Sequence, residues 1–173
     1  MNREPRAVLL QPIGTVRNSI TEQEALNASH FKRRESHIVL KKQYAKGLRG
    51  LEDYSHLFVL FWLHKVAKRN KVELITRPGH REHLPRVGVF STRNARHRPN
   101  HLGLTVVKFL SRRSNVIRVR GLDAFDGSPV LDIKPYTHMD IAGKKGVTRK
   151  RKNGSMVLGF KGRITVSEWW SRF

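Results

Sequence analysis

Short apolar runs separated by glycine- and proline-containing connections dominate the hydrophobic pattern of this chain. The most apolar run is His56–Leu63 (HLFVLFWL), and its nearly continuous apolar character predicts a buried central strand. Other short runs, mostly rich in β-branched or aromatic residues, predict further strands. They are Val8–Val16, Ser36–Lys41, Val87–Phe90, Leu104–Leu110, Val116–Arg120, Val130–Ile133 and Val157–Val166. Many short strands and few helical periodicities predict a mostly β protein, folded as a compact β-barrel or a tightly coiled sheet.

The connections predict turns more often than helices. Tyr44–Tyr54 contains two glycines and is typical of turns or a 3₁₀ segment, and Asp126-Gly127 is a strong turn signal between two strands. Pro12 and Gly14 indicate an edge position or a bulge in the first strand. The polar stretch Arg17–Arg34 is compatible with a loop or with a short helix over Glu22–Ala28. With no internal repeat or linker, 173 residues fit a single domain over residues 1–173, with a basic loop or arm at 143–154.

The charge of the chain is far from average. It has 35 Lys and Arg against 13 Asp and Glu, which gives a net charge of +22. Such self-repulsion destabilises a compact state unless a polyanion or counterions offset it. Nucleic acid is the natural partner, because each neutralised phosphate releases a counterion. A halotolerant or thermophilic surface, or binding to anionic lipid, are the alternatives.

Several classes of chemistry have no sequence signal. The chain has no cysteine, which excludes disulfides, thiolate catalysis and cysteine-ligated zinc and fits a reducing cytoplasm. There is no Walker loop, HExxH, GxSxG or GxGxxG after a strand. His80 and His83 lie in a proline-flanked loop that is a poor scaffold for metal, so no metal site is expected. The N-terminal apolar run is too short for a signal peptide and Leu57–Leu63 is too short to span a bilayer, so we expect a soluble cytoplasmic protein without membrane contact.

Two polar loops follow predicted strands and are candidates for a binding site. One carries Arg93, Arg96, His97, Arg98 and Asn100, and the other is Asp123–Pro129. The alternative for the first is a polar hairpin on a basic β protein. His64, at a strand end, becomes functional only if the Arg93 loop lies beside it.

Three further features have both a structural and a functional interpretation. Asp132 and Lys134 point to one face of a strand, as a structural ion pair or as a pair that orients a ligand ammonium or ribose. Trp169 and Trp170 either pack on the core or an interface, or stack on bases. The segment Gly143–Gly154 is a solvated loop or a phosphate clamp that positions RNA without reading its sequence. Its cations are Lys144, Lys145, Arg149, Lys150, Arg151 and Lys152.

Ordered sequence blocks resemble the TsaA-like family, whose members include S-adenosylmethionine-dependent methyltransferases of tRNA N6-threonylcarbamoyladenosine. The blocks are Gln11–Gly14, Leu48–Leu57, His64, Gly88–Arg93, Arg98–Asn100, Gly103-Leu104, Gly121–Asp123, Asp126–Val130 and Leu131–Tyr136. The chain resembles the short, single-domain members. It departs from the family pattern at Ala28–Phe31, where a Pro-Arg-Gln-like block is usual. It also departs in a longer Arg93 loop, and at His101-Leu102, where Pro-Ile is usual.

The resemblance implies a compact β-barrel rather than a Rossmann fold, with S-adenosylmethionine bound at a site shared with a second subunit of a homodimer. The implied cofactor-binding residues are His64, Lys65, Arg93, Leu104, Ala124, Phe125, Asp126 and Gly127. Asp132 or Tyr136 is the candidate acceptor for the N6 proton. Arg96, Arg98 and the six cations of residues 144–152 are the candidate tRNA contacts. The implied function is methyl transfer to N6 of threonylcarbamoyladenosine beside the tRNA anticodon. The alternative is a non-catalytic module that binds S-adenosylmethionine and RNA.

Overall fold

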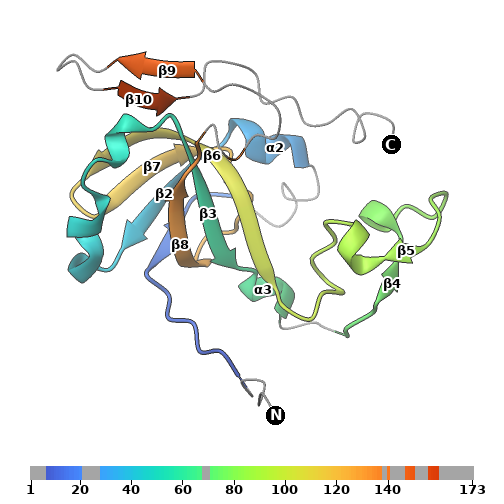
Figure 1. Cartoon of the computed structure of the whole chain (residues 1–173). Coiled ribbons are helices and arrows are strands. Elements are labelled where there is room, and N and C mark those ends of the chain that lie inside the picture. The colour runs from blue at the N-terminus through green and yellow to red at the C-terminus, as the bar shows by residue number, and fades with distance from the viewer. Residues whose placement is uncertain are drawn as a thin grey trace, which may run out of the picture.

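The fold is a closed antiparallel barrel of six strands in the order β1-β2-β7-β6-β3-β8 (Figure 1). The computed structural model describes residues 7–20, 28–67, 71–137, 140, 147–150 and 156–159. The barrel strands are β1 (Gly14–Arg17), β2 (Glu35–Leu40), β3 (His56–Trp62), β6 (Leu102–Arg113), β7 (Val116–Arg120) and β8 (Pro129–Pro135). The β-barrel predicted from the sequence is confirmed.

Strand β6 pairs with a different neighbour along each half of its length. Its first half pairs with β3, from Leu102 opposite Trp62 to Lys108 opposite His56. Its second half pairs with β7 as far as Arg113, with a register shift between Phe109 and Ser111 that bends the strand. This stagger between neighbouring strands is what a small barrel requires. It also explains why β6 is longer than the predicted run Leu104–Leu110, because its polar end is ordered by pairing with β7.

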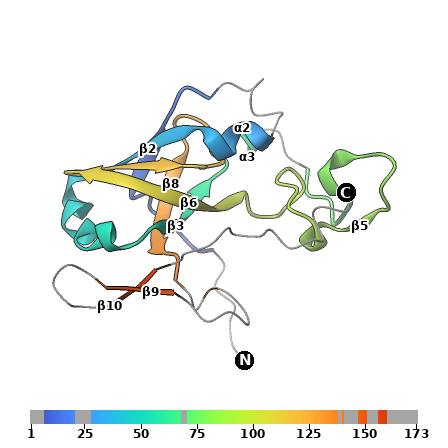
Figure 2. The ribbon, with the colours of Figure 1, turned by 90° about the horizontal axis from the view of Figure 1, so that it is seen from above.

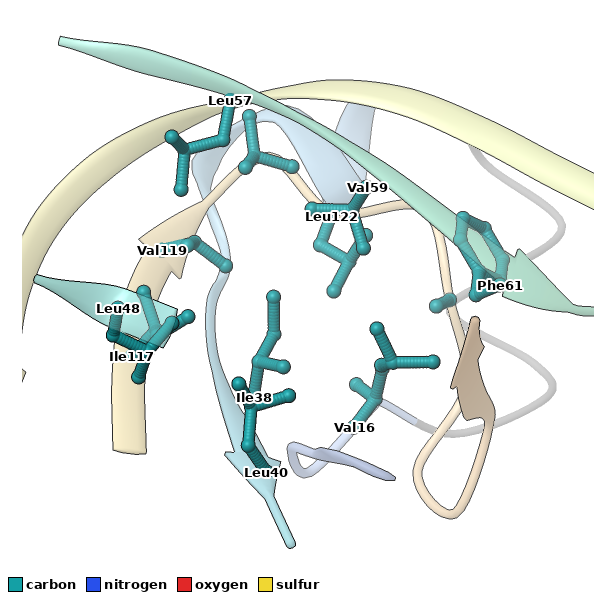
Figure 3. Packing of buried hydrophobic residues seen from close by; sticks show 13 residues of the cluster. Val16, Ile38, Leu40, Leu48, Leu57, Val59, Phe61, Ile117, Val119 and Leu122 are labelled. Atoms are coloured by element: carbon teal, nitrogen blue, oxygen red, sulfur yellow. The ribbon is translucent and has the colours of Figure 1, made fainter. Parts of the chain in front are cut away.

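The core lies inside the barrel and takes side chains from all six strands (Figure 3). In β3 the side chains of Leu57, Val59 and Phe61 point inward and are at most 1% exposed. Burial of each stabilises the fold by about 1.5–3 kcal/mol. The other core members are Val16, Ile38, Leu40, Leu48, Val107, Ile117, Val119, Leu122, Ala124 and Val130. The alternate side chains of β3 are only partly buried on the outer face, so the continuous apolar run marks a strand with two apolar faces.

The short helices and 3₁₀ turns lie between the strands. Among the described residues, the α-helices are α2 (Ala28–Arg33), which contacts β7 and buries Phe31, and α3 (His64–Ala67), which follows β3 directly. The 3₁₀ turns are η1 (Lys42–Leu48), η2 (Leu51–Asp53), η3 (Pro78–His80) and η4 (Val89–Ser91). The turns predicted within Tyr44–Tyr54 are confirmed by η1 and η2.

Residues 71–100 form a lobe beside the barrel, in which β4 (Ile75–Thr76) pairs with β5 (Val87–Gly88). Figures 1 and 2 show this lobe projecting from one side of the barrel beyond α3 and the start of β6. The predicted strand Val87–Phe90 is therefore wrong in extent, because the chain turns into η4 at Val89. The lobe has few buried apolar side chains, among them Leu84 and Val89.

Two other predicted segments differ from the structure. The strand predicted over Val8–Val16 begins only at Gly14, and Val8–Leu10 are exposed. Gly14 is required at this start, because a Cβ there would lie 2.5 Å from the Val39 carbonyl oxygen. In the basic segment, Val147–Lys150 forms strand β9 rather than a loop, paired antiparallel with β10 (Met156–Gly159).

Candidate functional site

The predicted site loops meet at one end of the barrel. There β3 ends at Trp62 opposite the start of β6 at Leu102, and the β7–β8 turn enters β8, where Val130 pairs with Phe61. Because neighbouring strands are antiparallel, the end of one lies beside the start of the next. This end of the barrel therefore carries His64, Lys65, Leu104 and residues 123–128, and we call these residues with Arg93 the loop cluster.

Hydrogen bonds to β1 fix the β7–β8 turn of the loop cluster. The Gly127 N–H donates to the Val16 carbonyl over 2.9 Å, and the Val16 N–H donates to the Ser128 carbonyl over 2.9 Å. Gly127 has a φ of 77°, a conformation that favours glycine, so the Asp126-Gly127 turn prediction is confirmed. The turn is thus rigid where it meets the barrel.

His64 and Lys65 contact this same turn. His64 Nδ1 lies 3.2 Å from the hydroxyl oxygen of Ser128, whose side chain is buried. The Lys65 ammonium lies 4.7 Å from the centroid of the Phe125 ring, within the range of a cation–π interaction. From the sequence, a functional role for His64 required that the Arg93 loop lie beside it. In the structure both interact with the β7–β8 turn, His64 at Ser128 and Arg93 through its charge at Asp123.

Arg93 reaches the loop cluster from the lobe. Its guanidinium donates a hydrogen bond to the Leu104 carbonyl over 3.3 Å and is otherwise exposed. Burial raises the pKa of the Asp123 carboxyl, and the charge of Arg93 partly offsets this rise. Asp123 in the turn therefore lies within electrostatic reach of Arg93, and a positive charge faces one side of the turn.

Sequence reasoning missed Asn18, which supports the β7–β8 turn through hydrogen bonds. The Asn18 side-chain amide donates to the Ser36 hydroxyl over 3.0 Å and to the Ala124 carbonyl over 2.9 Å. The Asn18 backbone N–H donates to Asp126, which gives this carboxylate a structural contact. No local pattern marks Asn18, because its partner lies 106 positions away. For Ser128, the partner of His64, the sequence did offer a signal, because Ser128 and Pro129 directly follow the Asp126-Gly127 turn.

The structure separates Tyr136 from the loop cluster of the same chain, whereas Asp132 lies one strand away from Leu104, because Asp132 pairs with Leu60 and Leu60 pairs with Leu104. Asp132 lies on the outer face of β8 and forms an ion pair with Lys134 at 2.6 Å. Tyr136 follows the far end of β8, roughly 23 Å along the strand from Pro129 at ~3.3 Å per residue. There its ring packs edge-on against Phe58, with centroids 5.0 Å apart.

The predicted nucleic-acid contacts are only partly within the described residues. Arg98 lies in the lobe, where it donates to the Thr92 carbonyl over 2.6 Å and lies over the Phe90 ring, and Arg96 is exposed. Of the basic segment, only the backbone of Arg149 and Lys150 is described, in β9. Lys144, Lys145, Arg151, Lys152, Trp169 and Trp170 lie outside the described residues.

The described part of the chain shows neither a metal-binding cluster nor a membrane-spanning helix. No three His, Cys, Asp or Glu side chains in this part of the chain lie together in a way that could hold a metal ion. No helix in the same part is both long and apolar enough to cross a membrane.

Known proteins match most of the chain. A family model for the tRNA-methyltransferase O N-terminal domain matches residues 17–140. A probable S-adenosyl-L-methionine-binding protein of Methanothermobacter thermautotrophicus is 44% identical over 130 residues, which are 75% of this chain and 90% of that protein. The tRNA (adenine(37)-N6)-methyltransferase of Mus musculus is 44% identical over 89 residues, which are 51% of this chain and 20% of that protein.

A solved structure agrees with the fold. The crystal structure of TrmO from Pseudomonas aeruginosa superposes with a TM-score of 0.62 at 27% identity, over 89% of this chain and 65% of that chain. The resemblance read from the sequence blocks is thereby confirmed. The chain belongs to the family of the tRNA-methyltransferase O N-terminal domain.

Proposed function

We propose that this chain is an S-adenosylmethionine-dependent tRNA methyltransferase that acts on N6 of threonylcarbamoyladenosine beside the anticodon. Family membership supports the activity. The names of the archaeal and mammalian relatives support the cofactor and an adenine acceptor, respectively. The chain spans a fifth of the mouse relative, so the substrate of that whole protein is a proposal for this one.

The observation that carries the cofactor site is the exposed guanidinium of Arg93 at the loop cluster. Its bond to the Leu104 carbonyl orients the side chain and leaves N–H groups for a carboxylate, which arginine binds bidentately. A Cβ at Gly127 would lie 4.0 Å from His64 Nε2, so the backbone of the turn passes close to the His64 ring at this glycine. These residues fit the carboxylate and the adenosine of S-adenosylmethionine.

The chain's own residues then hold the reactants in position. Arg93 holds the methionine carboxylate, while backbone groups at Leu104 and in the turn 124–127 read the adenine. When bound, S-adenosylmethionine supplies a methyl group on an already activated sulfonium. Positioning of the acceptor nitrogen in line with that methyl can therefore provide much of the rate.

A second copy of the chain completes this proposal. The outer face of β3 and β6 is apolar, with Leu60 opposite Leu104 and Trp62 opposite Leu102. Leu104 is 51% and Leu102 37% exposed. We propose that this outer face is the homodimer interface. Asp132 and Tyr136 border it, so each would orient or accept the N6 proton at the loop cluster of the partner.

The positive charge supports tRNA as the partner, and a tRNA substrate favours the cytoplasm as the place of action. Arg96 and Arg98 lie in the lobe, and Arg96 is exposed. The cations of residues 144–152 remain a proposed phosphate clamp for the anticodon stem, which would position the tRNA without reading its sequence.

The proposed function is tested by mass spectrometry of tRNA nucleosides from a strain that lacks the gene. We expect the N6-methylated form of threonylcarbamoyladenosine to disappear and to return with the wild-type chain but not with Arg93→Ala. Loss of a different N6-methyladenosine would contradict the threonylcarbamoyl substrate. An unchanged nucleoside profile would contradict the tRNA methyltransferase activity.

A further inference from the structure

Phe90 is an exposed aromatic side chain on a rigid turn of the lobe. The ring is 70% exposed, whereas the preceding residue, Val89, is 1% exposed. The Val89 N–H donates to the Leu74 carbonyl over 2.8 Å, and the Thr92 hydroxyl donates to the Val89 carbonyl over 2.9 Å. These contacts anchor η4 on both sides of Phe90, so the turn presents the ring to solvent in a fixed position.

Arg98 is held beside this ring before any partner binds. Its guanidinium donates to the Thr92 carbonyl over 2.6 Å, and its central carbon lies 5.7 Å from the centroid of the Phe90 ring. Thr92 therefore makes both contacts: its carbonyl accepts from Arg98, and its hydroxyl anchors η4. The aromatic ring and the planar cation are therefore parts of one preformed surface.

Charge decides which kind of partner fits this surface. Residues 71–100 contain seven lysines and arginines and only two glutamates. One of these, Glu73, lies 3.6 Å from His97. A flat apolar ring beside the Arg98 guanidinium, on a lobe with a positive net charge, matches an unpaired nucleobase with flanking phosphates, because bases stack on aromatic rings and on guanidinium planes. An apolar protein surface would instead leave these cations without anionic partners.

We propose that Phe90 and Arg98 form a stacking platform for an unpaired base of single-stranded RNA, such as a base of the anticodon loop. Arg96 and its neighbouring cations contact the flanking phosphates. This inference deepens the proposed function, because it places the RNA loop on the lobe beside the loop cluster. It requires binding of single-stranded RNA but no methyl transfer.

The test is a fluorescence anisotropy titration of the full chain, without cofactor, with labelled oligouridylate and with duplex RNA of the same length. Phe90→Ala should weaken binding of the single strand at least about fivefold and leave duplex binding within about twofold, because only unpaired bases can stack. Phe90→Trp should keep the affinity for the single strand. Arg96→Ala, the matched charge control, should weaken both.

Three controls separate stacking from other roles of Phe90. The Phe90→Ala variant should unfold at the wild-type temperature and bind S-adenosylhomocysteine with wild-type affinity in calorimetry. It should also have the wild-type mass in light scattering. Unchanged single-strand binding, an equal loss for duplex RNA, weaker cofactor binding or a change in oligomeric mass would overturn the platform. Failure of methyl transfer in an otherwise RNA-binding chain would contradict only the proposed function.

Discussion

Gly103→Ala is expected to destabilise the barrel through one contact. Gly103 lies in β6 opposite Phe61 of β3, and both residues face the core. A Cβ at position 103 would lie 2.3 Å from Cζ and 2.4 Å from Cε2 of the Phe61 ring. Real Cβ contacts are not this short, so the ring must move by about 1 Å. Phe61 is 1% exposed and close-packed, and it has little room to move.

The size of this effect follows from overpacking. Extra methyl groups in a well-packed core cost about 1–3 kcal/mol of unfolding free energy. For a chain of this length, each 1 kcal/mol lowers the unfolding temperature by about 2–4 °C, so we expect a decrease of roughly 2–12 °C.

The assay is thermal unfolding monitored by circular dichroism. Two control variants are measured beside Gly103→Ala, one expected to be nearly neutral and one expected to be at least as destabilising. Gly47→Ala should be close to neutral, because a Cβ there has nothing within 4 Å. Gly14→Ala should be at least as harmful, because its Cβ meets the backbone of Val39. Gly103→Ala should lower the unfolding temperature less in a Phe61→Leu background than in the wild-type background, because the smaller leucine leaves room for the added methyl group. An unfolding temperature of Gly103→Ala equal to the wild type would refute this reasoning.

Three other predictions concern the loop cluster, the lobe and pH. Arg93→Ala should weaken S-adenosylhomocysteine binding by about 1.5–3 kcal/mol in calorimetry, because a charged hydrogen bond is lost; unchanged affinity would remove Arg93 from the site. Asn94→Ala removes side-chain hydrogen bonds to Gly79, Thr76 and Arg77. It should therefore speed hydrogen exchange in residues 71–100 and leave protection of the barrel core unchanged. Burial lowers the pKa of His101 below 6.5, so the folded chain takes up fewer protons than the unfolded chain. The free energy of unfolding should fall as the pH drops below about 6.5. His101→Phe should reduce that slope in urea titrations, and an unaltered slope would argue against this origin.

Local signals predicted the parts of the fold that depend on neighbouring residues. Strand β7 has the predicted bounds, because its alternating apolar residues lie between clear turns, and the Asp126-Gly127 turn depends on a glycine with positive φ. The extents of β1 and β6 depend on pairing with distant strands, which no local pattern contains. The sequence of β3 is apolar at nearly every position, so it does not show which residues face the core and which lie on the outer face. Only the closed barrel distinguishes the two faces.

The candidate site was predicted in the same uneven way. His64, Arg93 and the turn 124–127 were named from ordered family blocks, and the structure places them around one end of the barrel. Asn18 was missed because it supports the turn across the barrel. Asp132 and Tyr136 were named as possible proton acceptors within the block Leu131–Tyr136, and the position of Tyr136 at the far end of β8 makes its proposed role depend on a second copy of the chain.

The most direct test of the central claim is transfer of a radiolabelled methyl group from S-adenosylmethionine to purified tRNA, followed by identification of the labelled nucleoside. We expect label on N6 of threonylcarbamoyladenosine with the wild-type chain and a strong loss of label with Arg93→Ala. Unlabelled tRNA together with normal cofactor binding would contradict the claim and favour a non-catalytic module that binds S-adenosylmethionine and RNA.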